Sequence, residues 1–474
     1  MANKTIKAFL WSFLDRFSAE IVSFVIGVIL ARLLSPYDYG IVGLTTIFVV
    51  FSNVFIEAGF SNALIRKVNR TEKDLSTAFY FNVVVGISIY LILFLTSPYI
   101  ANYFDEDILT ILVRIIALNV LLNSLSIVQN AILTANLNIR LQALINFAAQ
   151  VISGLAAIFC AYKGLGLYSL VVQSVASTFL RTVFLWIFTK WRPREHFSKE
   201  SFIYLWGFGS KLLLATTIGT AFNQIYTILI GKYIGKNELG YYSKGNSLAN
   251  HVSTIGNGVI QKVTVPILAG YQQDYKLLRD KFRELMKLLV LIMAPICAIC
   301  FFCAEDIIVF LWTDKWLEAS NMFKFLILGV MWQPIGNLSL CLLQVVNKTG
   351  LILKLEFPKK FMYVIIIIAG FRYGIYGLLI GHVLINIIAS VVNMIPTKRI
   401  LLYSYFGQLY DILRYILLAF VIGYIVSFIV NTDLPIIDLV LFIFIYLLLF
   451  IGFLYLIKDD IFMKYSSKLF KKQK

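Results

Sequence analysis

Charged residues are scarce in this sequence. Only 14% of its 474 residues are Asp, Glu, Lys or Arg, whereas a soluble domain carries roughly 25%. This shortage excludes a soluble enzyme and a disordered chain, because too few polar side chains remain to cover several soluble domains. The five cysteines all lie in apolar stretches, the three histidines lie far apart, and no nucleotide-binding loop is present. We therefore expect no catalytic residues, no metal site and no cofactor.

Long hydrophobic stretches, in contrast, are abundant in the sequence. Hydrophobic residues make up 60% of the chain, and the mean hydropathy is +0.83. The chain divides into apolar stretches of about 20 residues, the length of an α-helix that crosses a bilayer. We predict an all-α, polytopic membrane protein with about fourteen transmembrane helices. They are expected at residues 9–34, 40–65, 76–97, 107–133, 141–161, 166–189, 202–231, 239–269, 278–303, 317–346, 351–371, 374–396, 411–430 and 435–457.

The basic residues are distributed by side of the membrane. The net charge is +17, and Lys and Arg gather in alternate connections, such as 66–73, 190–199 and 276–287. Connections between them carry acidic residues such as Asp105 and Glu106. Because basic residues favour the cytoplasmic side, we predict that both termini are cytoplasmic. The charge is then explained by topology, and we expect no nucleic-acid partner.

An internal repeat organises the chain. A constant shift places ILARLLSPYDYG, Ile29–Gly40, on LIGKYIGKNELG, Leu229–Gly240. We predict that residues 1–200 and 201–400 form two six-helix lobes, related by a parallel pseudo-twofold repeat. Residues 401–474 then add two helices and a basic cytoplasmic tail.

Polar side chains recur on one face of corresponding helices in the two lobes. We expect them to line a water-filled cavity; the residues are Asn53, Asn223, Asn246 and Asn257. The alternative is that they hydrogen-bond to neighbouring helices, as Asn often does in membrane bundles.

Ionisable residues inside the predicted helices are costly and therefore candidates for function. Cations outnumber acids there, which favours an anionic guest such as a phosphate or an acidic sugar. The cations expected to bind it are Arg16, Arg114, Arg181 and Lys211. The carboxyl groups expected to couple an ion are Glu57, Glu20 and Asp15. Mutual neutralisation of Arg16 and Glu20, and a structural hydrogen bond from Glu57, are the alternatives.

Several motifs carry a family resemblance. They are ILARLLSPYDYGIVGL from Ile29, EAGFSNALIRK from Glu57, and FGSKLLLATTIGTAFNQIYTILIGKYIGKNELGYYSKGNSL from Phe208. Together they resemble the Wzx-type polysaccharide flippases, in the branch that includes colanic acid and teichuronic acid exporters. This branch is part of the multidrug/oligosaccharidyl-lipid/polysaccharide exporter superfamily. The resemblance covers most of the chain and weakens after about residue 400.

The resemblance implies a two-lobed bundle in the bacterial cytoplasmic membrane. It also implies export of an undecaprenyl-pyrophosphate-linked oligosaccharide to the outer leaflet, driven by an ion gradient. Membrane lipids and polysaccharide polymerase machinery are candidate partners. A cation-coupled multidrug exporter is the alternative, although its cavity should be acidic. A membrane enzyme, such as a polysaccharide polymerase or ligase, should present a large outer loop, which the sequence lacks. A nonspecific lipid scramblase stays open.

Overall fold

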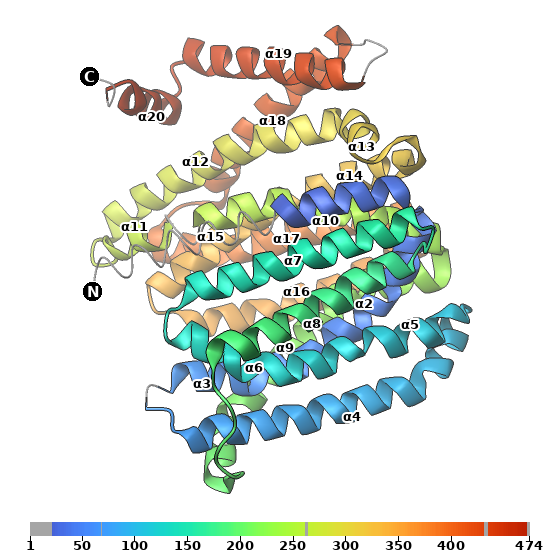
Figure 1. The fold of residues 1–474 in the computed structure, drawn as a ribbon. Coiled ribbons are helices and arrows are strands. Elements are labelled where there is room, and N and C mark those ends of the chain that lie inside the picture. Colours follow the sequence, from blue (N-terminus) through green and yellow to red (C-terminus); the bar gives the residue numbers. More distant parts are fainter. Residues whose placement is uncertain (1–20, 68, 261–263, 431–434, 472–474) are drawn as a thin grey trace. The chain divides into compact units, whose positions relative to one another are not determined.

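Helices are the regular structure of this protein wherever it is described. The computed structural model describes residues 21–67, 69–260, 264–430 and 435–471, and these ranges contain no strand. The predicted all-α class is confirmed (Figure 1). Backbone contacts divide the chain into two compact units, Met1–Ser243 and Lys244–Lys474.

The first unit is built mainly of long helices. A short apolar helix, Ile21–Leu33, precedes them. The elements that follow are α2 (Pro36–Ile56), the π-helical turn η1 (Glu57–Ser61), α3 (Asn62–Arg66), α4 (Glu72–Phe104), α5 (Ile108–Ile116), α6 (Leu118–Ala135), α7 (Ile139–Tyr162), α8 (Tyr168–Thr189), α9 (Lys199–Leu229) and the π-helical turn η2 (Ile230–Ile234). Helix α10 (Lys236–Val259) crosses the boundary into the second unit.

The second unit continues the same pattern. Its elements are α11 (Val265–Ala269), α12 (Tyr275–Phe302), α13 (Ala304–Trp312), the short turn η4 (Asp314–Trp316), α14 (Leu317–Val330), α15 (Trp332–Val345), α16 (Thr349–Phe371), α17 (Gly374–Leu401), α18 (Tyr405–Ile429), α19 (Pro435–Leu456) and α20 (Asp460–Lys471). Helix α12 packs along α18, and α16 packs along α17.

Local sequence signals set the helix ends. Helix α2 begins at a capping box, in which the Ser35 hydroxyl accepts from the Asp38 N–H and the Asp38 carboxylate accepts from the Ser35 N–H. Thr71 and Asp74 form the same box at the start of α4. Helix α4 ends at Asp105, whose left-handed backbone, with φ of 55°, stops the helix.

The predicted transmembrane stretches are helical along most of their described lengths, and a turn divides two of them into separate α-helices. The stretch 317–346 is divided at Met331 into α14 and α15, just before Pro334. This break agrees with the expected effect of a proline inside a helix. The stretch 107–133 is divided at Ala117 into α5 and α6. Helix α12, in contrast, continues through Pro295.

Ten helices or joined helix pairs are long and apolar enough to cross a membrane, counting only the described ranges. The predicted number of fourteen is therefore not confirmed, although a multi-pass membrane protein is. Many large apolar side chains are exposed, including Phe357 at 77% and Phe428 at 71%. Such exposure is abnormal in water but expected of surfaces that face lipid.

The two compact units do not have the boundaries that the repeat predicts. The first unit extends beyond residue 200 to Ser243. The reason is packing, because α9 lies against α2, η1 and α4. The repeat-based division into residues 1–200, 201–400 and 401–474 stays a prediction.

Candidate functional site

A polar cavity of about 250 Å³ lies inside the first unit. It is lined from η1, α3, α6 and α8, by Glu57, Ser61, Asn62, Asn123, Ser126, Ile127, Asn130 and Arg181. Glu57 is the first residue of the π-helical turn η1, a geometry that is frequent at functional sites. Arg181 of α8 interacts electrostatically with the Glu57 carboxylate. The cavity thus brings together two of the charges that the sequence analysis identifies.

Amide side chains surround these two charges. The Asn123 Nδ2 donates to Asn53 Oδ1 at 3.0 Å, and the Gln142 Nε2 donates to Asn130 Oδ1 at 2.5 Å. Sequence reasoning missed the cavity residues of α6. Their signal was available, because Asn123, Ser126 and Asn130 are spaced three and four residues apart, which places them on one helical face.

The other predicted anion-binding and ion-coupling residues lie elsewhere. Asp15, Arg16 and Glu20 lie outside the described residues. Lys211 belongs to α9, but its side chain is also outside the described part. Arg114 is placed between α5 and α4, where its Nε donates to Ser97 Oγ at 2.9 Å. Its guanidinium lies 4.3 Å from the centre of the Phe94 ring.

The remaining predicted cavity asparagines have varied surroundings. Asn223 is exposed on α9, and Asn246 is half-buried on α10. Asn257 accepts from Asn337 Nδ2 at 2.8 Å and donates to Ser253 Oγ at 3.1 Å. Asn53 and Asn257 therefore both make hydrogen bonds between helices, while their role in lining a transport cavity stays a prediction.

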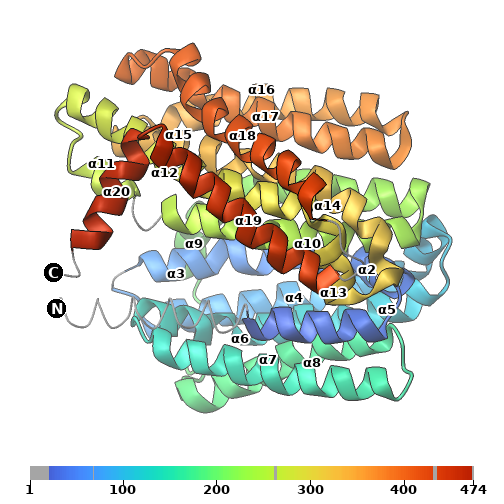
Figure 2. The same cartoon turned by 90° about the horizontal axis from the view of Figure 1, so that it is seen from above.

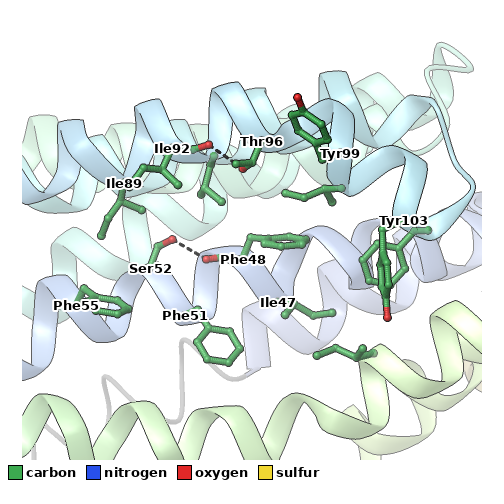
Figure 3. A pocket seen from close by; sticks show the side chains of 14 residues that line it. Ile47, Phe48, Phe51, Ser52, Phe55, Ile89, Ile92, Thr96, Tyr99 and Tyr103 are labelled. Carbon is green, nitrogen blue, oxygen red and sulfur yellow. Dashed lines mark hydrogen bonds between the residues drawn. The ribbon is translucent and has the colours of Figure 1, made fainter.

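An apolar groove of about 800 Å³ lies on another part of the first unit (Figure 3). Helices α2 and α4 form its walls, and Ile228 of α9 contributes to it. The residues of the two walls are Ile47, Phe48, Phe51, Ser52, Phe55, Ile89, Ile92, Leu93, Thr96, Tyr99, Ile100, Tyr103 and Phe104. The hydroxyls of Ser52 and Thr96 both donate to the backbone of their own helices. The groove therefore presents mainly hydrocarbon and aromatic surface.

Helix α2 and its continuation η1 separate these two environments. Ile47, Phe51 and Phe55 line the apolar groove, whereas Glu57 lines the polar cavity. At 100° per residue, Asn53 and Glu57 share a helical face that is opposite to the one formed by Ile47, Phe51 and Phe55. The same element thus has one face suited to a polar group and another suited to an apolar chain.

A cluster of ion pairs joins α4 and its connection to the region around η2. Lys232 Nζ lies 2.7 Å from Asp105 Oδ2, and this hydrogen bond and charge lower the pKa of the Asp105 carboxyl. Glu106 accepts from the Tyr37 hydroxyl at 2.8 Å and pairs with Lys236 at 3.4 Å. These acidic residues therefore hold two segments that are far apart in sequence.

Two glycines of the repeat lie in reciprocal contact. A Cβ atom on Gly40 would overlap the backbone carbonyl of Lys236, and one on Gly240 would overlap that of Pro36. The sequence shift that pairs Gly40 with Gly240 also pairs Pro36 with Lys236. Equivalent positions of the two repeats thus contact each other in the same way, as expected around a pseudo-twofold axis.

Comparison with known proteins identifies the family. Residues 29–321, more than half of the chain, match the family model described as polysaccharide biosynthesis protein. The chain belongs to this family.

Two bacterial relatives show how much of the chain this similarity covers. The teichuronic acid biosynthesis protein TuaB of Bacillus subtilis (strain 168) is 26% identical over 301 residues, which cover 61% of this chain and 62% of TuaB. The chain thus matches less than two thirds of the length of TuaB. The lipopolysaccharide biosynthesis protein WzxC of Escherichia coli (strain K12) is 21% identical, over 85% of this chain and 83% of WzxC.

A solved structure shows the same fold. The lipid II flippase MurJ, in an inward closed conformation, has a TM-score of 0.73 at 17% identity, covering 94% of this chain and 99% of MurJ. The predicted resemblance is confirmed, as is the prediction of a helical membrane protein of the polysaccharide biosynthesis family.

Proposed function

We propose that this chain moves an undecaprenyl-pyrophosphate-linked oligosaccharide from the cytoplasmic to the outer leaflet of the bacterial cytoplasmic membrane by alternating access. The names of TuaB and WzxC place these relatives in polysaccharide biosynthesis, and MurJ is called a lipid II flippase. An ion gradient drives the movement, and both termini are cytoplasmic.

The observation that carries this proposal is the division of surfaces by α2 and η1. A polar cavity with a carboxylate and a guanidinium lies on one side, and an apolar groove lies on another. A polar solute would not bind in the apolar groove, and a hydrocarbon would not bind in the polar cavity. An amphiphile with a charged head group could contact both, which supports a lipid-linked substrate.

Arg181 is the proposed contact for the pyrophosphate. A guanidinium binds phosphate oxygens through paired, charge-assisted hydrogen bonds. In the described structure its charge interacts with that of Glu57, so carboxylate and pyrophosphate compete for the same cation. We propose that a proton or cation taken up by Glu57 releases Arg181 to the substrate, which couples the ion to transport. Arg114, bonded to Ser97, is the secondary candidate.

The test is complementation of a deletion strain with Arg181→Gln and with Glu57→Gln. Loss of one charge-assisted interaction costs about 1.5 to 3 kcal/mol, so we expect Arg181→Gln to lower export by roughly ten- to a hundredfold at unchanged protein level. Export is measured as surface polysaccharide and as the fraction of lipid-linked units that a membrane-impermeant glycan-cleaving reagent reaches. Glu57→Gln is expected to remove the dependence of export on the ion gradient.

The matched control is Arg194→Gln, because Arg194 is exposed in the connection between α8 and α9. It should export as the natural chain does. Normal export by Arg181→Gln would refute the assignment of the pyrophosphate contact. Normal exposure of lipid-linked units in the deletion strain itself would refute the flippase function.

A further inference from the structure

The polar cavity of the first unit follows one face of α6. Asn123, Ser126 and Asn130 line it from this helix, and their spacing of three and four residues places them on one face. Asn123 and Asn130 are two helical turns apart, which is about 10 Å along the axis. The cavity therefore has two ends, and a ligand that fills it contacts different residues at each end.

The charged residues lie toward the end at Asn123. Its Nδ2 donates to Asn53 Oδ1 at 3.0 Å, which sets α2 beside α6 at this level. Glu57 follows Asn53 by one helical turn, and Arg181 of α8 interacts electrostatically with Glu57. The lining residues that follow Glu57 along the chain, up to the α6 residues at the other end, are uncharged. The second end is therefore polar but neutral.

Asn130, at the neutral end, is held from outside the cavity. Its Oδ1 accepts from Gln142 Nε2 at 2.5 Å, and Gln142 of α7 does not itself line the cavity. A carboxamide has one carbonyl oxygen and one NH₂ group. Because the bond to Gln142 occupies the oxygen, the Nδ2 group of Asn130 is the part that remains to donate to a ligand.

The backbone fixes the position of Gln142. Helices α6, α7 and α8 pack side by side (Figure 2). Between α6 and α7, Leu137 has a left-handed backbone with φ of 55°, and the Asn138 N–H donates to the Leu133 carbonyl at 2.9 Å. This is the hydrogen-bond pattern of a Schellman turn. Helix α7 begins directly after it, so Gln142, in the first turn of α7, is held beside the end of α6.

The two ends of the cavity suit different parts of a lipid-linked head group. The guanidinium of Arg181 suits phosphate oxygens, whereas the uncharged amide of Asn130 suits the oxygen of a hydroxyl group. The cavity volume of about 250 Å³ is below the roughly 300 to 1,000 Å³ of pockets for drug-sized ligands. It therefore takes a small polar group next to the phosphate and not a whole oligosaccharide.

We propose that Asn130 is a specificity-determining residue, which donates to a sugar hydroxyl of the head group, and that Gln142 is the residue that positions it. This inference rests on the proposed function, in which Arg181 binds the pyrophosphate. The two contacts are separate, because they lie toward opposite ends of the cavity. The sugar contact can therefore be removed without removing the pyrophosphate contact.

Binding of two probes to the full-length protein in lipid nanodiscs tests the proposal. One probe is undecaprenyl pyrophosphate, which carries no sugar, and the other is undecaprenyl pyrophosphate linked to glucose. We expect Asn130→Leu to weaken binding of the glucose-linked probe about tenfold, because one hydrogen bond to the ligand is lost. Binding of the sugar-free probe should stay unchanged, whereas Arg181→Gln should weaken binding of both probes.

The matched control is Asn119→Leu, on the same helix. Asn119 also bonds to a neighbouring helix, since its Nδ2 donates to Ser174 Oγ of α8 at 2.8 Å. It does not line the cavity. Asn119→Leu should therefore leave the binding of both probes unchanged.

A second variant tests the positioning role. Gln142→Met keeps the length of the side chain but removes the donor to Asn130, so we expect it to weaken binding of the glucose-linked probe alone, by about threefold. In the double variant with Asn130→Leu, Gln142→Met should cause no further loss, because it acts only through Asn130. A further loss in the double variant would refute the positioning role.

The outcomes separate this inference from the proposed function. Equal binding of the two probes by the natural chain would overturn the sugar contact, as would Asn130→Leu that binds both probes normally or loses both equally. Binding of neither probe by the natural chain would instead overturn the proposed function. If Asn130→Leu does not fold, Gln142→Met provides the same comparison of the two probes from outside the cavity.

Discussion

The reciprocal contact of Gly40 and Gly240 makes a quantitative prediction. In Gly40→Val, the new side chain must displace the backbone carbonyl of Lys236, which belongs to a helix end and not to a flexible side chain. Overpacking of this kind costs about 1 to 3 kcal/mol. That cost should raise the population in which the contact is open by roughly 5- to 150-fold. Gly240→Val should have a similar effect, because it displaces the equivalent carbonyl of Pro36.

Hydrogen exchange measured by mass spectrometry reports this opening. Peptides that contain residues 36–44 and 236–244 should both exchange faster in either variant, since each glycine faces the other segment. Gly219→Val is the control, because a Cβ at Gly219 meets no atom. The reasoning would be refuted if Gly40→Val exchanged like the natural chain, or if Gly219→Val accelerated the same peptides equally.

Two further predictions concern ion pairs. Asp411 is buried and accepts two hydrogen bonds from Arg283, at 2.5 and 3.0 Å. We expect Asp411→Ala to lower the free energy of unfolding by about 2 to 3 kcal/mol. This is less than the loss of a fully buried pair, because the Arg283 side chain is half-exposed. The control is Asp280→Ala, which removes an exposed pair with Arg279 and should lower the free energy of unfolding by less than about 1 kcal/mol. Equal falls in melting temperature would contradict this. The second prediction concerns Asp105, whose carboxyl has a lowered pKa in the folded protein. Its ion pair with Lys232 therefore stabilises the fold fully at any pH above the unfolded pKa of about 3.9. This stabilisation is lost as the pH falls through the lower pKa of the folded state. The difference in melting temperature between the natural chain and Asp105→Asn should therefore be the same at pH 8 and at pH 5. A difference that is smaller at pH 5 would contradict this prediction, because it would mean that the pKa of Asp105 in the folded protein is not lowered.

The class of the protein could be predicted from local sequence properties. Long apolar stretches predicted helices wherever the structure describes them, and the motif around Ile29–Gly40 led to the correct family. The repeat was visible as a shift between Gly40 and Gly240, and their reciprocal contact supports it. These features are encoded by residues close together in the chain or by similarity between segments, so no knowledge of packing was needed.

The candidate site could be predicted only in part. Glu57 and Arg181 were both identified as charges inside helices, but nothing in the sequence indicated that they face each other across one cavity. Arg114 was predicted to bind the same anion as Arg181. In the structure its Nε donates to Ser97 Oγ and to the backbone carbonyl of Phe94, between α4 and α5. The periodicity of a helix shows which residues share a face. It does not show which neighbouring helix that face meets.

The sequence alone therefore determined a helical membrane protein and its family, and it located candidate charges inside the predicted helices. Hydropathy and helical periodicity depend on residues within one or a few turns of each other, so both can be recognised in the sequence. Tertiary structure decided the meeting of Glu57 and Arg181 at one cavity and the two environments on either side of α2. Each of these depends on contacts between helices that are far apart in sequence, where packing, and not local preference, selects the partner.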